Sequence, residues 1–276
     1  MAVRKSALSI FGDKSVNGVV RAPITSTANP LVKQARALRH RKARADSGLF
    51  LIEGIRPVGE ALEAGWELDV ILYAEDVLES DFAATLIADP AAPLQPVTAE
   101  VMKSFADKEN PQGIVAIAHQ RFSSLSDLPV MRRGVAVVSP QDPGNVGTIL
   151  RTVDAIGADV VLLLDGGVDP YHPTCVRASM GTLFWLPLIR ASFLEFVEWS
   201  KARSVQIIGT SAHAEVDYRA FQPVEPWMLL LGSEQKGLGA LHLAASDVVV
   251  SLPMRGRASS LNLAVAAGIL LYAFGG

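Results

Sequence analysis

The stretch GVAVVSPQDPGNVGTILRTVDAIGADVVLLLDG, residues 134–166, decides the fold class of this chain. It holds two continuous apolar runs, VAVVS (135–139) and VVLLL (160–164), separated by a turn rich in proline and glycine and by a segment with helical periodicity. Uninterrupted Val and Leu runs are typical of strands covered on both faces, and a helix between two such strands joins parallel neighbours. The stretch therefore predicts a strand–helix–strand unit of a parallel sheet.

The same alternation continues to the end of the chain. Further strands are predicted at VQIIGT (205–210), WMLLL (227–231) and DVVVS (247–251), and helices near 145–156, 174–181, 192–203 and 260–274. We predict an α/β domain over residues 134–276, with a mostly parallel sheet and helices on both faces. The uncharged tail from Ala258 has about the length of a membrane span, but it opens with Ser259, Ser260 and Asn262, so we expect a buried helix.

A second, smaller α/β domain is predicted at residues 23–118, after a flexible lead over residues 1–22. A helix is expected from Asn29 or Pro30 to about Arg44, a strand at GLFLIEG (48–54) and a helix at 57–65 that ends at a glycine. A strand at LDVILYA (68–74), a helix at 81–88 and a strand at GIVAIA (113–118) follow. The polar segment beginning HQRFSSLSDLP, residues 119–133, is predicted to be the linker.

Composition limits what the two domains can do. Half of the 276 residues are hydrophobic, which is enough for one large core or two smaller ones and argues against disorder as the main state. Cys175 is the only cysteine, which excludes disulfides within the chain and cysteine-rich zinc sites. The N-terminus lacks the apolar stretch of a secretory signal. A reducing cytoplasm is the expected location.

The formal net charge of −3 hides an uneven distribution. Residues 1–60 carry eleven Lys or Arg against four Asp or Glu, a net +7, and the remaining residues carry a net −10. The segment KQARALRHRKAR (33–44) has six basic residues and no acid, and either a solvated amphipathic helix or a nucleic-acid contact would explain it. The candidate RNA-binding residues are Lys33, Arg36, Arg39, Arg41, Lys42 and Arg44, with Lys33, Arg36 and His40 near one helical face.

Three fragments place polar residues directly beside apolar runs, where α/β proteins bind ligands. In the first, Asn145 stands where the N-cap of a helix is expected, and Arg151 points roughly 150° away from the apolar stripe of that helix. Arg151 is then either an ordinary exposed arginine or a guanidinium that binds phosphate. In the second, GSEQKGL (232–238), Glu234 lies at the carboxyl end of a strand. The spacing of its glycines matches neither the phosphate-binding loop of nucleoside triphosphatases nor the glycine-rich turn of dinucleotide-binding proteins.

The third fragment, LPMRGRASSLN (252–262), is the most distinctive. Pro253 ends a strand, RGRASS forms a loop, and Ser260 and Asn262 stand at the start of a helix that is apolar all round. Capping of that helix by one of the two serines is the ordinary explanation. Polar residues beside an otherwise buried helix also indicate a binding site at its N-terminus. Such a helix could also bury one face against a second subunit.

The ordered set NVGTILR (145–151), GSEQKGL and LPMRGRASSLN resembles the three motifs of the SpoU, or TrmH-like, branch of the SPOUT RNA methyltransferases. The segment ITSTANPLVKQARALRHRKARADSGLFLIEG (24–54), followed by NPQGIVAIA (110–118), is similar to the small ribosomal-protein-like domain that precedes the catalytic domain in many members. The resemblance covers most of the chain. One departure is Ala264, where a serine is common.

The resemblance implies transfer of a methyl group from S-adenosylmethionine to a ribose 2′-hydroxyl of RNA, without a metal, in a C-terminal domain that carries a deep trefoil knot. It implies a catalytic set of Asn145, Arg151, Glu234, Ser260 and Asn262. It implies cofactor binding, largely through backbone groups, by Thr210, Leu231, Gly232, Gly237, Leu252, Met254 and Leu261. Arg151 would receive or polarise the proton of the 2′-hydroxyl while it binds a phosphate. Because a guanidinium is a poor base, Glu234 or an RNA phosphate would share in removing that proton.

The resemblance favours ribosomal RNA over transfer RNA as substrate, since tRNA-directed relatives usually carry a basic extension after the last helix. It also implies a homodimer and no membrane contact. A tRNA 2′-O-methyltransferase and a non-catalytic RNA-binding or ribosome-assembly factor of the same fold remain alternatives. An oxidoreductase would need a glycine fingerprint that is absent. The sequence decides neither the methylated nucleotide nor between a housekeeping and an antibiotic-resistance role.

Overall fold

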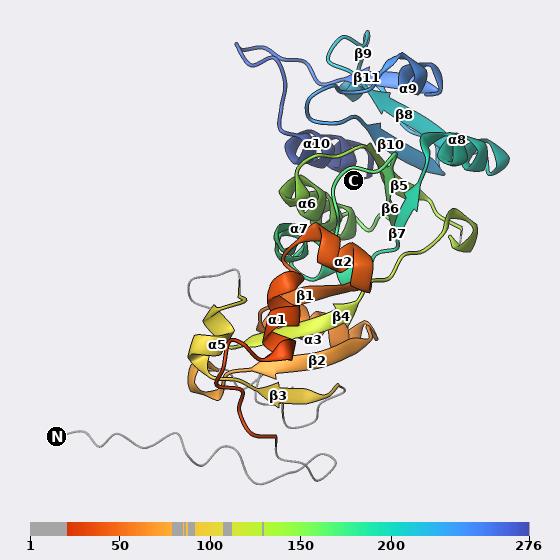
Figure 1. Ribbon diagram of the computed structural model, residues 1–276. Helices are drawn as coiled ribbons and strands as arrows, with labels where there is room; N and C mark the ends of the chain where they lie inside the picture. Colours follow the sequence, from red (N-terminus) through yellow and green to blue (C-terminus); the bar gives the residue numbers. More distant parts are fainter. Residues whose placement is uncertain are drawn as a thin grey trace. The chain divides into compact units, whose positions relative to one another are not determined.

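The computed structural model describes residues 21–78, 85, 87, 92–106, 112–128 and 130–275. The chain divides into two compact units, Met1–Gln120 and Arg121–Gly276 (Figure 1). The predicted lead over residues 1–22 and the predicted helix at 81–88 lie almost wholly outside the described residues, and so do the first two residues of NPQGIVAIA. Each unit has its own sheet and is described by itself.

The first unit contains a four-stranded sheet in the order β1-β4-β2-β3. Strands β1 and β2 are antiparallel to β4, and β3 is parallel to β2. The strands are β1 (Leu49–Glu53), β2 (Leu68–Tyr73), β3 (Leu94–Pro96) and β4 (Ile114–His119). The central strand β4 is buried over almost its whole length because helices cover both faces of the sheet.

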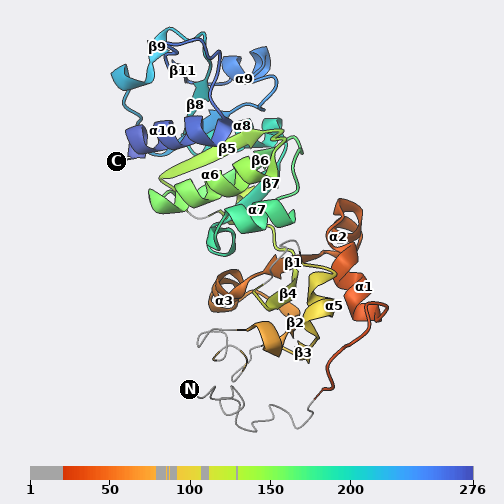
Figure 2. The same cartoon turned by 90° about the vertical axis from the view of Figure 1, so that its left-hand side faces the viewer.

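Helices α1 (Pro30–Ala37) and α5 (Ala99–Lys103) cover one face of this sheet, and α3 (Ile55–Glu63) covers the other (Figure 2). Val32 of α1 and Met102 of α5 share a core cluster with Val70 and Ile117 of the strands. Burial of each such side chain stabilises the fold by about 1.5–3 kcal/mol. On the opposite face, Phe50 and Trp66 form an edge-to-face aromatic pair.

The single helix predicted up to Arg44 is wrong, because two helices occupy this stretch. Helix α1 ends at Ala37 and α2 (Arg41–Ser47) begins after His40, whose backbone is extended at φ −96° and ψ 134°. The Nη1 atom of Arg44 donates to the carbonyl oxygens of Leu38 and Arg39, each at 2.9 Å, so a side chain satisfies acceptors at the end of the first helix. Arg44 is therefore a structural residue of the helix junction, and of the expected common face only Lys33 and Arg36 share a helix, because His40 lies outside α1.

The second unit contains a seven-stranded sheet in the order β7-β6-β5-β10-β8-β11-β9, in which every neighbouring pair is parallel. This confirms the predicted mostly parallel sheet. The strands are β5 (Arg133–Val138), β6 (Val160–Leu164), β7 (Leu188–Ala191), β8 (Gln206–Thr210), β9 (Val216–Asp217), β10 (Trp227–Leu231) and β11 (Val248–Ser251).

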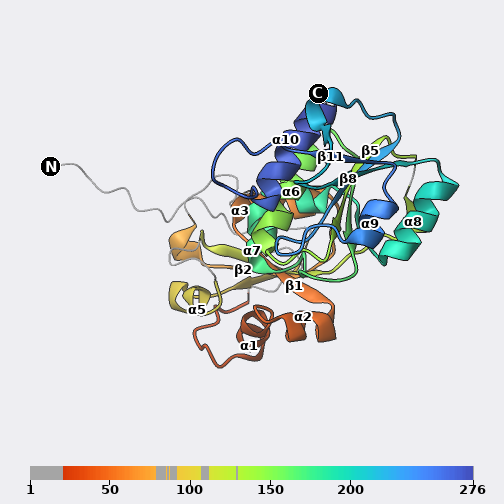
Figure 3. The ribbon, with the colours of Figure 1, turned by 90° about the horizontal axis from the view of Figure 1, so that it is seen from above.

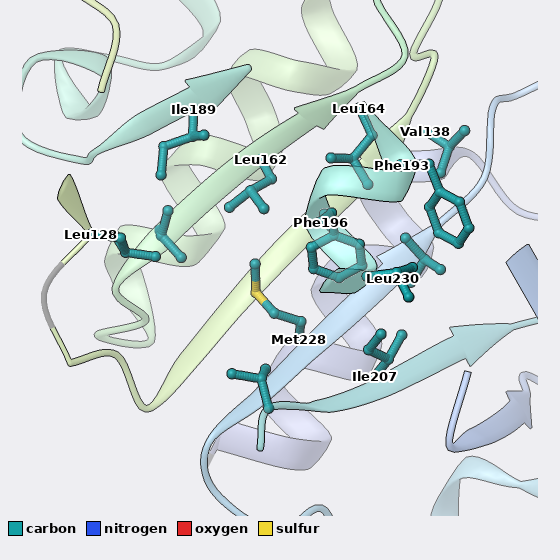
Figure 4. Packing of buried hydrophobic residues seen from close by; sticks show 14 of the residues in the cluster. Leu128, Val138, Leu162, Leu164, Ile189, Phe193, Phe196, Ile207, Met228 and Leu230 are labelled. Carbon is teal, nitrogen blue, oxygen red and sulfur yellow. The ribbon is translucent and has the colours of Figure 1, made fainter. Parts of the chain in front are cut away.

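Helices cover both faces of this sheet (Figure 3). Helices α6 (Pro143–Ala155), α7 (Pro173–Ala178) and α10 (Leu263–Gly275) lie on one face, and α8 (Phe193–Ala202) and α9 (Ala240–Ala244) lie on the other. Phe193 and Phe196 of α8 pack against Val138, Leu162 and Leu230 of three strands (Figure 4). Helix α10 buries one side against this domain, and none of the helices in the described residues is long and apolar enough to cross a membrane.

Much of the segment predicted as a linker packs on the second unit. The backbone N–H of Arg121 donates to the hydroxyl of Tyr171 at 3.0 Å, and Ser123 forms a bridge with Ile189 of β7. The ring of Phe122 lies 4.0 Å from the guanidinium carbon of Arg190. Leu128 and Met131 are buried in the core of this unit. The described residues of this segment, 121–128, 130 and 131, therefore belong to the second unit, and Ser123 pairs with the edge strand β7.

Candidate functional site

Four consecutive strands of the large sheet, β5, β10, β8 and β11, bring the three polar fragments to one edge. Because all four are parallel, their carboxyl ends meet there, which is the usual ligand edge of an open α/β sheet. Asn145 follows β5, Thr210 ends β8, Gly232 follows β10 and Leu252 follows β11. The fold therefore gathers segments that lie more than a hundred residues apart in the sequence.

A chain of side-chain hydrogen bonds joins the three fragments. The Nδ2 atom of Asn145 donates to Oε1 of Glu234 at 2.9 Å, and Nδ2 of Asn262 donates to Oδ1 of Asn145 at 2.9 Å. Asn145 is buried between the other two residues. Each amide uses both its donor and its acceptor, so the geometry fixes the orientation of all three side chains. The prediction that Asn145, Glu234 and Asn262 lie together is confirmed.

Glu234 is held as a carboxylate by N–H donors. Its Oε2 atom accepts from the backbone N–H of Gln141 at 2.9 Å, and Oε1 accepts from the N–H of Asp142 at 3.1 Å as well as from Asn145. Partial removal from water acts to raise the pKa of Glu234, but these hydrogen bonds together outweigh it and hold the pKa below its usual value. A carboxylate with a lowered pKa and three donors is a weak base, so this geometry suits a positioning role.

Two capping expectations are wrong. Asp142, and not Asn145, is the N-cap of α6, because its Oδ1 accepts from the N–H of Gly144 at 2.6 Å. The Asn145 side chain is thereby free to reach Glu234 from the first turn. At α10 neither serine caps the helix, because Oδ1 of Asn262 accepts from the N–H of Ala264 at 2.9 Å. Ser260 lies in the exposed loop before the helix.

Arg151 and Ser260 are outside the hydrogen-bond chain. Arg151 is exposed on α6, about 1.7 turns after Asn145, and within the described part of the chain its guanidinium makes no hydrogen bond or ion pair. Of the five residues predicted to be catalytic, the structure thus joins three and leaves these two facing solvent. A solvent-facing guanidinium on α6 is available to an anionic substrate.

The loop after β10 folds back tightly on itself. A Cβ atom added to Gly232 would lie 2.0 Å from the carbonyl carbon of Gly237, so only glycine fits there. The N–H of Gly237 donates to the carbonyl of Ser233 at 2.9 Å, and Gly237 has φ +61°, a conformation that glycine adopts without strain. No atom lies within 4 Å of the position of a Gly237 Cβ, so the outer side of the turn is open.

The residues at this edge could hold a nucleoside cofactor. Leu231 is buried at the end of β10, Leu252 and Met254 are half-buried, and Leu261 is exposed beside Asn262. These apolar side chains and open backbone groups suit the aromatic base of an adenosine. The hydroxyl of Thr210 already donates to the carbonyl of Leu230 at 3.1 Å. Among the described residues no group of three or more His, Cys, Asp or Glu could hold a metal ion.

Sequence reasoning missed Gln141 and Asp142, whose N–H groups hold Glu234. The pair Asp142–Pro143 carried a usable signal, since an acidic residue directly before a proline is typical of an N-cap with proline at the first helical position. The contact of these two N–H groups with a carboxylate ninety residues away has no such signal, because only the pairing of β5 with β10 brings them together.

The predicted RNA-binding residues of the first unit divide into three groups. Arg44 is buried, with 1 % of its surface exposed, so the expectation that it binds RNA is wrong. Arg36 is half-buried and donates from Nε to the carbonyl of Ser104 at 3.2 Å and from Nη2 to its hydroxyl at 3.1 Å. The remaining four are exposed and stay candidates: Lys33, Arg39, Arg41 and Lys42.

Family models match both units. The model of the SpoU rRNA Methylase family matches residues 133–272, which include all three fragments of the site. The model of the MRM3-like substrate binding domain matches residues 29–116.

Relatives of known name cover nearly the whole chain. The 23S rRNA (uridine(2479)-2′-O)-methyltransferase of Streptomyces viridochromogenes is 34% identical over 244 residues, which are 85% of this chain and 85% of that protein. The 23S rRNA (guanosine(2553)-2′-O)-methyltransferase RlmP of Bacillus subtilis is 32% identical over 250 residues, 90% of this chain and 97% of that protein.

Solved structures agree with the fold. An rRNA methyltransferase from Sinorhizobium meliloti with bound AdoMet superposes with a TM-score of 0.82 at 37% identity, covering 91% of this chain and 96% of that one. The SpoU methyltransferase AviRb from Streptomyces viridochromogenes, in complex with the cofactor AdoMet, gives a TM-score of 0.82 at 33% identity, covering 89% and 96%.

Proposed function

The chain belongs to the SpoU rRNA Methylase family, and from this premise we propose how its site works. The protein is an S-adenosylmethionine-dependent methyltransferase that acts on a ribose 2′-hydroxyl of ribosomal RNA. The observation that carries this conclusion is the hydrogen-bond chain that joins the three family motifs at the ligand edge of the sheet. The tRNA-directed and non-catalytic alternatives are not favoured, because the relatives quoted act on 23S rRNA.

The base of the target nucleotide stays open in this proposal. One relative is named for a uridine and the other for a guanosine, and both are named for the ribose 2′-oxygen. We therefore propose that the chemistry shared with these relatives lies at the sugar and that contacts outside the hydrogen-bond chain select the base.

When bound, S-adenosylmethionine supplies a methyl group on a positively charged sulfur. Asn145, Glu234 and Asn262 hold the three loops together, and they would thereby position the 2′-oxygen relative to the methyl donor. Arg151 binds the adjacent phosphate and polarises or receives the hydroxyl proton. The 2′-oxygen would lose its proton as it accepts the methyl group, and the proton would leave to solvent through Arg151 or the phosphate.

We propose that the cofactor lies against the loops after β8, β10 and β11. The tight turn at Gly232 and Gly237 and the backbone of Leu231, Leu252 and Leu261 would hold it, with Met254 and Thr210 at its margins. Ser260 would line the approach of the ribose. The support for these assignments is the position of all eight residues at one sheet edge or in the loops that leave it.

The first unit would hold the RNA by its phosphates. Lys33, Arg39, Arg41 and Lys42 are exposed on or beside α1 and α2, and no acidic residue interrupts this segment. Contacts of this kind release counterions, so affinity should fall steeply with salt. A cytoplasmic location and a deep trefoil knot in the second unit belong to the same proposal, supported by the family resemblance.

We propose that α10 forms a homodimer contact. Val265, Ile269 and Tyr272 lie along one side of the helix and are 50%, 37% and 60% exposed, and Leu261 precedes them at 39%. An aligned apolar stripe on an outer helix is typical of a subunit interface.

Replacing Val265 and Ile269 with glutamate is expected to convert a dimer into a monomer, because a charge buried in an apolar interface has no partner. Light scattering during size exclusion measures the mass. The control is Leu194→Glu on α8, where a leucine is 64% exposed on the other face of the sheet. A monomeric wild-type protein, or a double variant that remains dimeric, would contradict this contact.

The proposed function is tested by mapping 2′-O-methylated riboses in 23S rRNA from cells with and without this protein. We expect one ribose to lose its methyl group when the protein is absent and to regain it when the protein is restored. Loss of a methyl group from a transfer RNA instead would support the alternative substrate. Unchanged methylation of every RNA would contradict the enzymatic function.

A further inference from the structure

The second unit has no general attraction for RNA. Residues 121–276 contain twelve Lys or Arg and thirteen Asp or Glu, a net charge of −1. Such a surface does not attract a phosphate backbone electrostatically unless positive side chains cluster at one place. The way in which this unit holds the target strand therefore depends on where its unpaired cations lie.

Several of these cations are bound to other groups of the unit. Arg133 pairs with Glu225 at 2.5 Å, and Arg219 pairs with Asp217 at 2.5 Å. The described residues of this unit include six basic side chains without a hydrogen bond or an ion pair: Arg132, Arg151, Lys201, Lys236, Arg255 and Arg257.

Four of these six stand on the three fragments of the site: Arg151, Lys236, Arg255 and Arg257. Arg151 follows Asn145 on α6, Lys236 follows Glu234 by two residues, and Arg257 precedes Asn262 by five. Arg255 is set aside because its charge already acts on Asp217, whose pKa is lowered to about 2, mainly by hydrogen bonds from Arg219. Arg132 directly precedes β5, at the opposite end of the strands from the site, and Lys201 lies on α8.

The backbone that carries Lys236 and Arg257 is fixed at both sides. Lys236 lies in the turn closed between Ser233 and Gly237, and its own N–H donates to the Ser233 hydroxyl at 3.3 Å. The loop of Arg257 starts at Ser251, whose hydroxyl donates to the carbonyl of Val216 at 3.2 Å, and ends at Asn262, which is bonded to Asn145. Both side chains are exposed. Lys236 thus stands on a closed turn, and Arg257 stands in an exposed loop whose two ends are anchored.

The negative charge of these loops is already compensated. Glu234 is the only acidic residue in the segments 232–239 and 252–262, and three N–H groups bind its carboxylate. These two loops together carry three cations and one carboxylate, whereas the unit as a whole has a net charge of −1; the exposed carboxylate of Asp142 lies in the neighbouring loop before α6. A pair of separate, exposed cations suits the phosphates of a bound RNA strand. A guanidinium binds a phosphate through two parallel hydrogen bonds, and an ammonium group binds it as a point charge.

Building on the proposed function, we infer that Lys236 and Arg257 bind RNA phosphates that flank the target nucleotide and so position its ribose in the site. They act on the RNA and not on the methyl donor. The first unit then supplies most of the affinity for RNA. Lys236, Arg257 and Arg151 determine which nucleotide of the RNA strand lies at the site.

The test uses Lys236→Gln, Arg257→Gln and the double variant of the full chain, with Arg132→Gln and Lys201→Gln as controls. Methyl transfer to an unmodified 23S rRNA transcript is measured against RNA and salt concentration, RNA binding by filter retention, and S-adenosylmethionine binding by calorimetry. Each single variant is expected to raise KM for RNA about three- to tenfold and to reduce the slope of log affinity against log salt by about 1. Donor affinity is expected to stay at the wild-type value.

Variants that bind and methylate the RNA like the two controls would overturn the inference. Weakened donor binding with an unchanged salt slope would also overturn it, because the residues would then serve the cofactor. A wild-type protein that transfers no methyl group would refute the proposed function, whereas the salt slopes of RNA binding would still decide the role of Lys236 and Arg257.

Discussion

Replacing Arg151 with lysine is expected to lower kcat for methyl transfer by about 100- to 10,000-fold, the range of a lost proton-transfer group. Lysine keeps the positive charge but lacks the planar guanidinium. In our proposal the guanidinium donors bind a phosphate and contact the 2′-hydroxyl at the same time. Glu234 cannot replace it, because that carboxylate already accepts three N–H groups and has a lowered pKa.

Rates of label transfer from S-adenosylmethionine to the rRNA transcript measure this effect, and calorimetry is expected to show donor binding unchanged within about twofold. Asp154→Asn provides the matched control, since Asp154 is also exposed on α6, three residues further on. Wild-type transfer by Arg151→Lys would remove Arg151 from the chemistry and leave an RNA phosphate as the proton acceptor.

Replacing Gly232 with alanine is expected to abolish donor binding, with a loss of at least about 100-fold in affinity. The added Cβ would lie 2.0 Å from the carbonyl carbon and 2.3 Å from the carbonyl oxygen of Gly237. Both contacts are to backbone, so the turn must open and carry Glu234 away from Asn145. Each tenfold loss corresponds to about 1.4 kcal/mol.

The control for this variant is Gly239→Ala in the same loop. The nearest atom to a Gly239 Cβ is Nδ1 of His242 at 3.6 Å, an ordinary contact, and the backbone has φ −78°. We expect Gly239→Ala to bind the donor normally in calorimetry. Normal binding by Gly232→Ala, with circular dichroism showing both variants folded, would contradict the role assigned to the turn.

The sheet of the second unit was largely predictable because its inner strands are long apolar runs. Strands β6 (Val160–Leu164) and β10 (Trp227–Leu231) match their predicted bounds. Strand β7 was missed because Leu188–Ala191 is short and contains Arg190, and β9 has only two residues. Strand β7 depends on pairing with β6, where Ile189 lies opposite Leu162, and β9 depends on pairing with β11, where Val216 lies opposite Val250; local sequence does not encode these pairings.

For the candidate site, the sequence predicts which residues lie close together but not which hydrogen bonds they form. Parallel strands bring their carboxyl ends together, so the meeting of Asn145, Glu234 and Asn262 follows from the order of the motifs and the sheet. Which residue caps α6 or α10 depends on competition between nearby acceptors, and Asp142 and Asn262 prevail there. The burial of Arg44 depends on the break between α1 and α2, which a continuous basic helical pattern conceals.

The central claim is that this edge of the sheet transfers a methyl group to a ribose oxygen of ribosomal RNA. The most direct measurement compares two 23S rRNA transcripts that differ only at the mapped nucleotide, one with a ribose and one with a 2′-deoxyribose, as acceptors of label from S-adenosylmethionine. We predict stoichiometric labelling of the first and none of the second. Equal labelling of both transcripts would place the methyl group on the base and contradict the account.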